Sequence, residues 1–183
     1  MRIIGGTAKG HTIKAPKGVD TRPTLDRVRE SVFNVLSNRG IFGTHVLDIF
    51  SGTGAVAIEA LSRGAAHAVA VDFKTGKLIL ENAKHCHVED RLEIIPRKLS
   101  QLKNYIVGRQ FDYIFSDPPY ENGFIQETID MVVDCDLLKP EGVLLLEHHK
   151  DEAFTLPESW KCIKEQKFGY TMVSYFVNTA ERS

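Results

Sequence analysis

The chain has 183 residues, 43% of them hydrophobic, and a formal net charge of −1 at pH 7. This length suffices for one domain with a short appendage. No apolar run approaches membrane-spanning length, and the first residues lack the apolar core of a signal peptide. We therefore expect a cytoplasmic protein with no membrane partner.

The cysteines and histidines give no sign of a disulfide framework or a metal site. Cys86, Cys135 and Cys162 are widely spaced and odd in number, and the chain has no C-x-x-C pair. His85 and His87 flank Cys86, but adjacent residues of a helix point in different directions, so one metal could not easily collect all three. We expect no metal cofactor.

Charge is distributed unevenly along the chain. Residues 1–40 contain eight Lys and Arg against three Asp and Glu, whereas the remaining residues contain 15 against 21. A basic segment on an acidic body is typical of a protein whose basic part meets a polyanion and neutralises its phosphates. An ordinary solvated surface is the alternative.

The N-terminal part reads as a small hairpin followed by a helix. Short strands are predicted over 2–4 and 11–14, joined by a glycine-rich turn. A hairpin this small is marginal alone, so we expect it to dock on the body or to order on its ligand. A helix is predicted over 25–38, where apolar residues repeat at helical spacing. We divide the chain into a basic hairpin arm, 1–24, and a second domain, 25–183.

Strands and helices alternate through the rest of the chain. Strands are predicted over 45–50, 67–72, 92–95, 111–116 and 143–147, with helices over 55–63, 74–84, 99–107 and 124–133. Residues 161–167 and 171–177 read as an antiparallel hairpin at the sheet edge. This order predicts an α/β fold, a doubly wound, Rossmann-like and mostly parallel sheet of seven strands with an antiparallel C-terminal hairpin.

A glycine turn, Gly52-Thr53-Gly54, follows the first strand of this domain and opens a helix. It fits a dinucleotide fingerprint, and Asp72 ends the next strand, where a carboxylate would hold a ribose. Asp48 favours a different ligand, because a carboxylate there would repel a pyrophosphate but stabilise the ammonium and sulfonium of S-adenosylmethionine. A helix cap is the other role open to Asp48. The predicted donor contacts are Asp48, Ser51, Gly52, Gly54 and Asp72.

The sequence Asp117-Pro118-Pro119-Tyr120 follows directly on the predicted strand 111–116. Two prolines end a strand, and the carboxyl ends of parallel strands face the ligand crevice. Asp117 and the Pro118 carbonyl would then offer two hydrogen-bond acceptors beside the Tyr120 ring, which suits a planar group carrying an NH2. The alternative is a turn in which Asp117 caps the following helix.

We predict that Asp117, Pro118 and Tyr120 are catalytic residues of an amino-methyltransferase. An exocyclic amine on a nucleobase is a poor nucleophile, because its lone pair is delocalised into the ring. Hydrogen bonds from its N–H groups to Asp117 and the Pro118 carbonyl would aim the lone pair at the methyl carbon, while Tyr120 stacks on the base. A base inside a duplex cannot reach such a pocket, so the target must be flipped out or unpaired.

Segments throughout the chain together resemble the bacterial RsmD family. In chain order they read R-I-I-G-G from position 2, R-P-T from 22, D-R-V-R-E from 26, D-I-F-S-G-T-G from 48, E-A-L-S-R-G-A from 59, D-P-P-Y from 117 and F-G-Y-T from 168. That family methylates guanine N2 in 16S rRNA. The resemblance implies a class I methyltransferase fold, S-adenosylmethionine as donor and the small ribosomal subunit as partner. It also implies RNA contacts by Arg2, Lys9, His11, Arg22, Arg27 and Arg29.

The chain departs from the family pattern at two places. His11 stands where the family usually has Arg, which weakens one phosphate contact. After the third strand of the domain the residues are Pro96-Arg97-Lys98-Leu99, where such enzymes usually offer an acidic or amide side chain near adenine. No adenine contact is therefore assigned.

Two other functions fit the same residues. One is an amino-methyltransferase that acts on a DNA base or a protein amide. The other is a non-catalytic rRNA-binding assembly protein, to which the missing adenine contact lends support and the intact D-P-P-Y sequence does not. No dimerisation stripe stands out, so we expect a monomer.

Overall fold

The computed structural model describes residues 1–18, 23–120 and 122–180. The strands are β1 His45–Ile49, β2 His67–Val71, β3 Leu92–Ile95, β4 Phe111–Ser116, β5 Leu138–His149, β6 Trp160–Phe168 and β7 Thr171–Asn178. The helices are α1 Pro23–Arg39, α2 Ala55–Ser62, α3 Gly76–His85, α4 Leu99–Ile106 and α5 Phe124–Asp134, with a short 3₁₀ helix, η1, over Glu89–Arg91.

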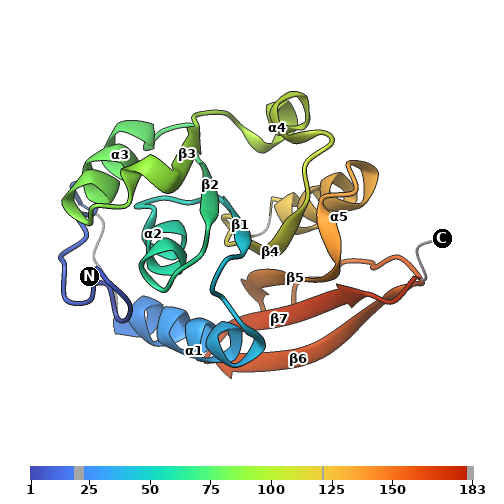
Figure 1. Ribbon diagram of the computed structural model, residues 1–183. Helices are drawn as coiled ribbons and strands as arrows, with labels where there is room; N and C mark the ends of the chain where they lie inside the picture. The colour runs from blue at the N-terminus through green and yellow to red at the C-terminus, as the bar shows by residue number, and fades with distance from the viewer. Residues whose placement is uncertain (19–22, 121, 181–183) are drawn as a thin grey trace.

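Within the described residues, seven strands form one sheet in the order β3-β2-β1-β4-β5-β7-β6. Strands β1 to β5 are parallel, and β7 pairs antiparallel with both β5 and β6. The predicted doubly wound sheet with an antiparallel C-terminal hairpin is confirmed (Figure 1). The strand order reverses between β1 and β4, and ligands of such sheets bind at this switch point, beside the carboxyl ends of the strands.

Each face of the sheet carries its own apolar layer, because successive residues of a strand point to opposite faces. Val46 of β1 belongs to the cluster formed with α1, α2 and α3, while Leu47 and Ile49 belong to the cluster formed with α4 and α5. Figure 1 shows the sheet between these two groups of helices. The strands are therefore packed on both faces, which fixes the positions of their carboxyl ends.

The N-terminal segment, residues 1–15, is docked on the body. Ile3, Ala8 and Ile13 are buried in the same apolar cluster as α2. Instead of the two predicted strands, the structure has one isolated antiparallel bridge, between Arg2 and Thr12. The reason is that part of the backbone of this segment bonds to side chains of α2 and not to a partner strand.

Close approach to α2 explains the glycine at position 6 of this segment. The φ of Gly6 is +78°, and a Cβ there would lie 1.8 Å from the carbonyl oxygen of Ser62. The fully buried carboxylate of Glu59 accepts hydrogen bonds from the backbone N–H groups of Ile4, at 2.9 Å, and Gly5, at 2.8 Å. A larger residue at Gly6 would push the segment off the helix.

Strand β5 begins earlier than the sequence predicts. We expected a turn over 139–142, but a continuous strand runs over Leu138–His149. The register of β4 against β5 shifts between Phe111 and Tyr113, which accommodates extra residues of β5 opposite β4. Pro140 is exposed at this irregularity, where its missing N–H costs little.

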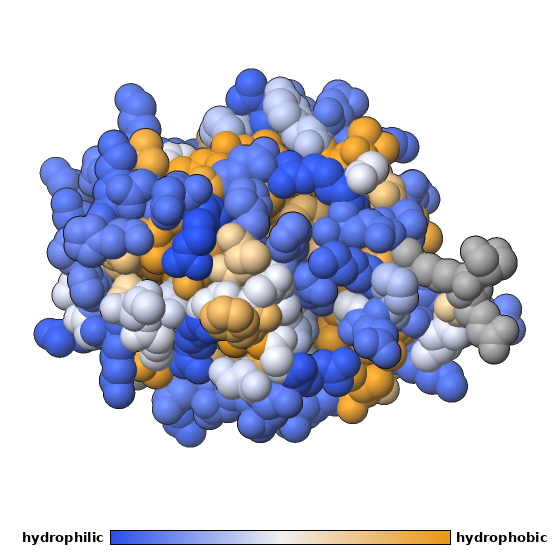
Figure 2. Space-filling view, viewed as in Figure 1, coloured by the Kyte–Doolittle hydropathy of each residue, from blue (hydrophilic) through white to orange (hydrophobic). Residues whose placement is uncertain are grey.

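The described residues contain no helix long and apolar enough to cross a membrane. Over the same ranges, no group of three or more His, Cys, Asp and Glu is placed to hold a metal ion. Figure 2 shows hydrophilic side chains over most of one face, with smaller apolar areas between them.

Candidate active site

A glycine turn joins β1 to α2 at the carboxyl end of the sheet. Gly52 and Gly54 have φ of +58° and +80°, a backbone conformation that costs other residues roughly 1–2 kcal/mol. A Cβ on Gly54 would lie 2.9 Å from the Ile79 side chain, whereas one on Gly52 would meet no atom within 4 Å. Gly54 therefore allows close packing behind the turn, and Gly52 leaves open space on the wall of a cavity.

Two strand-end carboxylates hold this turn. Asp48 is 1% exposed and accepts hydrogen bonds from the Ser51 hydroxyl at 2.5 Å and from the backbone N–H of Ala57 at 3.2 Å. Asp72 accepts the backbone N–H of Gly52 at 3.0 Å and, through its other oxygen, two backbone N–H groups of the following turn. The bond to Ala57 satisfies an N–H of the first turn of α2, so Asp48 supports the helix as well as lining the cavity.

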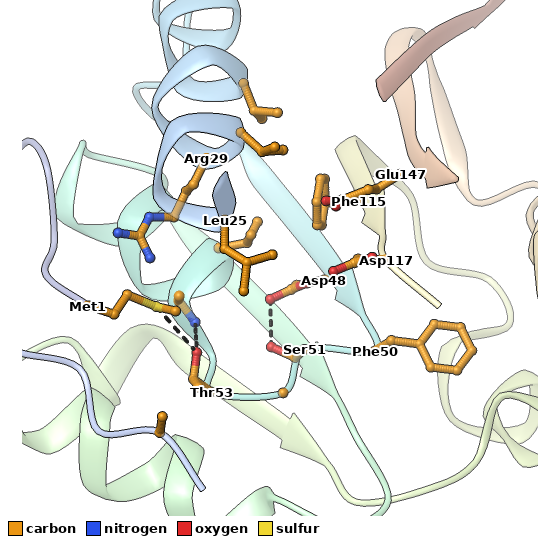
Figure 3. A pocket seen from close by; sticks show the side chains of 16 residues that line it. Met1, Leu25, Arg29, Asp48, Phe50, Ser51, Thr53, Phe115, Asp117 and Glu147 are labelled. Atoms are coloured by element: carbon orange, nitrogen blue, oxygen red, sulfur yellow. Dashed lines mark hydrogen bonds between the residues drawn. The ribbon is translucent and has the colours of Figure 1, made fainter. Parts of the chain in front are cut away.

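Asp48, Asp117 and Glu147 line one cavity (Figure 3). Asp117 follows β4 directly, and Glu147 lies in β5, where the pairing of Ser116 with Leu146 places the two acidic residues side by side. Helix α5 has no side-chain cap. The alternative in which Asp117 caps that helix is therefore not supported.

The pKa values of all three carboxyls are raised. Burial raises the pKa of Asp48 to about 7, although the hydrogen bonds from Ser51 and Ala57 favour its charged form. Burial raises the pKa of Asp117 to about 7, and burial together with the nearby Asp117 charge raises the pKa of Glu147 to about 8. A ligand that brings positive charge or N–H donors would stabilise the ionised form of such buried carboxyls.

A wider cleft of about 760 Å³ continues from this cavity along the strand ends. Asp72 and Phe73 line it on the β2 side, and Pro118 and Tyr120 line it after β4. Tyr120 is 44% exposed, and its hydroxyl forms a hydrogen bond with the Thr171 hydroxyl at 2.9 Å. The volume is in the range of small-molecule sites, and one edge of the cleft is aromatic.

The predicted catalytic and donor residues gather around these two hollows. Of the eight, seven line one or both of them: Asp48, Ser51, Gly52, Asp72, Asp117, Pro118 and Tyr120. Gly54 lies behind the turn, where it packs against Ile79. Their roles in binding and catalysis stay predictions.

The residues expected to contact RNA are in part brought together. Arg2, Lys9 and Arg27 are exposed and line one shallow hollow between the N-terminal segment and α1. His11 is half-buried, and its Nδ1 lies 2.9 Å from the carbonyl oxygen of Ala8. The first three are therefore available to a phosphate, and His11 only in part.

Arg29 lines the same hollow, but its side chain is buried and already paired. Arg29 is 5% exposed; its guanidinium donates to the backbone carbonyl of Arg2 and to Asp26, and it lies 3.8 Å from Glu59. Such burial argues against the phosphate contact expected of Arg29, because the charge is already used to hold the N-terminal segment. Arg22 lies outside the described residues.

Among the cavity residues that sequence reasoning missed, Glu147 and Met1 are the most informative. Glu147 appeared only as the polar end of an apolar strand, although a carboxylate at a strand end beside that of Asp117 could have signalled a site. Met1 also lines the cavity, and its sulfur lies 3.9 Å from the Thr53 hydroxyl. No local pattern marks Met1, because its place depends on how the N-terminal segment docks.

Comparisons with known proteins support the same fold. The family described as Conserved hypothetical protein 95 matches residues 1–177. Ribosomal RNA small subunit methyltransferase D of Escherichia coli is 30% identical, over 99% of this chain and 91% of that protein. This chain belongs to the RsmD family. The protein of the same name from Haemophilus influenzae is 32% identical, over 96% of this chain and 91% of its own length.

A similar methyltransferase is also present among the solved structures. The structure of yhhF from Escherichia coli matches with a TM-score of 0.87 and 30% identity, and the match covers 99% of both chains. The sheet described above is that of a class I methyltransferase. The resemblance on which the RsmD assignment first rested is confirmed, and it extends over nearly the whole chain.

Proposed function

We propose that this protein transfers a methyl group from S-adenosylmethionine to the exocyclic N2 amine of a guanine in the 16S rRNA of the small ribosomal subunit. The observation that carries the proposal is a single cavity lined by Asp48, at the glycine turn, and by Asp117, at the start of the D-P-P-Y sequence. A donor site and an amine-binding site meet there. Membership of the RsmD family, whose named relatives are small-subunit rRNA methyltransferases, supports the RNA substrate.

The residues at the glycine turn fit the methyl donor. S-adenosylmethionine supplies an electrophilic methyl group on a positively charged sulfonium. The carboxyl of Asp48 would stabilise positive charge in the cavity, and Asp72, in the adjoining cleft, would bind the ribose hydroxyls. Gly52 leaves space at the wall where a side chain would intrude.

The residues after β4 fit the acceptor amine. Asp117 and the Pro118 carbonyl would accept its N–H groups, and Tyr120 offers an exposed ring on which a base can stack. The amine nitrogen forms a bond to the methyl carbon as the carbon–sulfur bond breaks in line. The surplus proton of the amine then leaves to Asp117 or to water.

An exposed basic surface extends this site toward RNA. Arg2, Lys9 and Arg27 face solvent along one hollow and would neutralise phosphates beside the flipped nucleotide. His11 and Arg22 remain candidates for the same role. We propose that residues 1–24 act as an RNA-binding arm and residues 25–183 as the methyltransferase domain, in a monomeric cytoplasmic protein.

The test is transfer of labelled methyl from S-adenosylmethionine to small ribosomal subunits that lack this modification. DNA and free 16S rRNA serve as parallel substrates, and nucleoside analysis identifies the product. We expect N2-methylguanosine in the rRNA. Label in DNA or in subunit protein would support the other acceptors considered above. Binding of rRNA without transfer, in a protein that still binds the donor, would support a non-catalytic assembly role.

A further inference from the structure

Two buried glutamates of this protein have opposite surroundings. Glu59 is fully buried and is paired with backbone N–H groups and with Arg63 at 2.9 Å. Glu147 is 5% exposed, yet among the described residues no hydrogen bond or ion pair engages its carboxyl. A buried acid without a partner is costly. The burial of Glu147 is explained if its carboxyl pairs with a bound ligand.

The position of Glu147 limits the kind of ligand that could be its partner. It lines both the cavity and the wider cleft, as Asp117 does. The pairing of Ser116 with Leu146 sets the two acidic residues on neighbouring strands, which lie about 4.8 Å apart. Figure 3 shows both at the same wall of the cavity. Two acceptors at this spacing suit a ligand edge with two adjacent N–H donors.

The edge of guanine has this pattern. Its N1–H lies next to the N2 amine, whereas adenine presents an unprotonated nitrogen beside its amine. A carboxylate only accepts hydrogen bonds, so it can bind N1–H of guanine and opposes a bare ring nitrogen. With Asp117 at the amine, the neighbouring position of Glu147 falls beside N1.

We propose that Glu147 accepts the N1–H of the target guanine and thereby selects guanine as the acceptor base. This inference rests on the proposed function, since it assigns a residue to the base that receives the methyl group. It also gives the buried carboxyl its missing partner. In the protein without RNA, an apolar residue at this position would pack at least as well as Glu147. Base selection would then be the reason for an acidic residue at this buried position.

The test compares two acceptor bases. Small subunits are reconstituted with rRNA carrying guanine or 2-aminopurine at the nucleotide identified by the transfer assay. 2-Aminopurine keeps the amine on C2 but has no hydrogen on N1. The assay is run above pH 8, because burial and Asp117 raise the pKa of Glu147 to about 8 and the ionised form cannot donate. We expect the wild type to prefer guanine in kcat/KM by roughly ten- to a hundredfold.

Three variants separate base selection from other roles. In Glu147→Gln the amide can donate to a bare N1, so the preference should shrink by about tenfold or more. Glu147→Asp keeps an acceptor, but the shorter side chain holds it farther from the base. The rate should therefore fall while guanine stays the preferred base. Glu158→Gln changes an exposed carboxyl and should keep both rate and preference. Cooperative urea unfolding of all three variants would show that they are folded.

The outcomes distinguish this inference from the proposed function. If the wild type forms N2-methylguanosine and Glu147→Gln keeps the full preference for guanine, the inference is wrong. It is also wrong if Glu147→Gln loses activity equally on both bases. If the wild type methylates neither base at N2, the proposed function itself fails, whatever Glu147 does.

Discussion

The carboxylate of Glu59 accepts a 2.9 Å hydrogen bond from the backbone N–H of Ile4, which ties the N-terminal segment to helix α2. The same carboxylate pairs with Arg63 and lies 3.8 Å from the buried Arg29. Because Met1 lines the cavity, this contact joins the N-terminal segment to the candidate donor site. The stability of the fold and the shape of the site are thus linked through one residue of α2.

Replacing Glu59 should strongly destabilise the protein. In Glu59→Ala we expect the free energy of unfolding to fall by roughly 3–5 kcal/mol, because the N–H groups of Ile4 and Gly5 lose their acceptor and the buried Arg29 keeps only Asp26 as a counter-charge. Urea unfolding measures the loss. Glu158→Ala, at an exposed position, should change it by less than about 0.5 kcal/mol. Equal midpoints for the two variants would show that Glu59 does not hold the segment.

Two glycines of the N-terminal segment form a matched pair. Both have positive φ, but a Cβ on Gly6 would lie 1.8 Å from a carbonyl oxygen, while one on Gly10 would meet nothing within 4 Å. Gly10→Ala should cost roughly 1–2 kcal/mol for its backbone alone. Gly6→Ala should cost about 1–3 kcal/mol more, because the segment must move off α2. Urea unfolding tests this, and equal losses would contradict the close contact.

Asp117→Asn tests the acceptor site directly. We expect the rate of methyl transfer to fall by roughly 10²–10³-fold, because the amide is a weaker acceptor for the target amine. Affinity for S-adenosylmethionine, measured by calorimetry, should change little. The control Asp90→Asn alters an exposed carboxyl at the opposite end of the sheet, before β3, and should leave transfer intact. Unchanged transfer in Asp117→Asn would refute the proposed chemistry.

The raised pKa of Glu147 predicts how stability depends on pH. Folding raises this pKa from 4.5 to about 8, mainly through burial, so the folded protein holds the proton more tightly than the unfolded chain. The stabilisation is complete below about pH 4.5 and is lost as pH rises toward 8. Glu147→Gln does not titrate, so its stability relative to the wild type should increase across this window. Urea unfolding over a pH series measures the difference, and a difference independent of pH would contradict the shift.

Much of the fold could be predicted from the sequence because its signals are local. Apolar runs ending at Asp48, Asp72 and Asp117 marked strands with polar carboxyl ends, and the parallel order brings such ends to one edge. The turn at Gly52 and Gly54 was likewise readable, since glycine is needed where φ is positive. The start of β5 could not be predicted, because Pro140 reads as part of a turn in the sequence. In the structure a register shift against β4 accommodates this proline within the strand.

By itself, the sequence determined the class of fold, the place of the candidate site at the strand ends and the chemical character of its residues. Only the tertiary structure decided which charged groups are free to act. Arg29 and Arg27 are near neighbours on α1, yet one is buried by the N-terminal segment and the other faces solvent. Glu147 joins Asp117 only through the pairing of β5 with β4. Burial and pairing arise between distant parts of the chain, which no local pattern records.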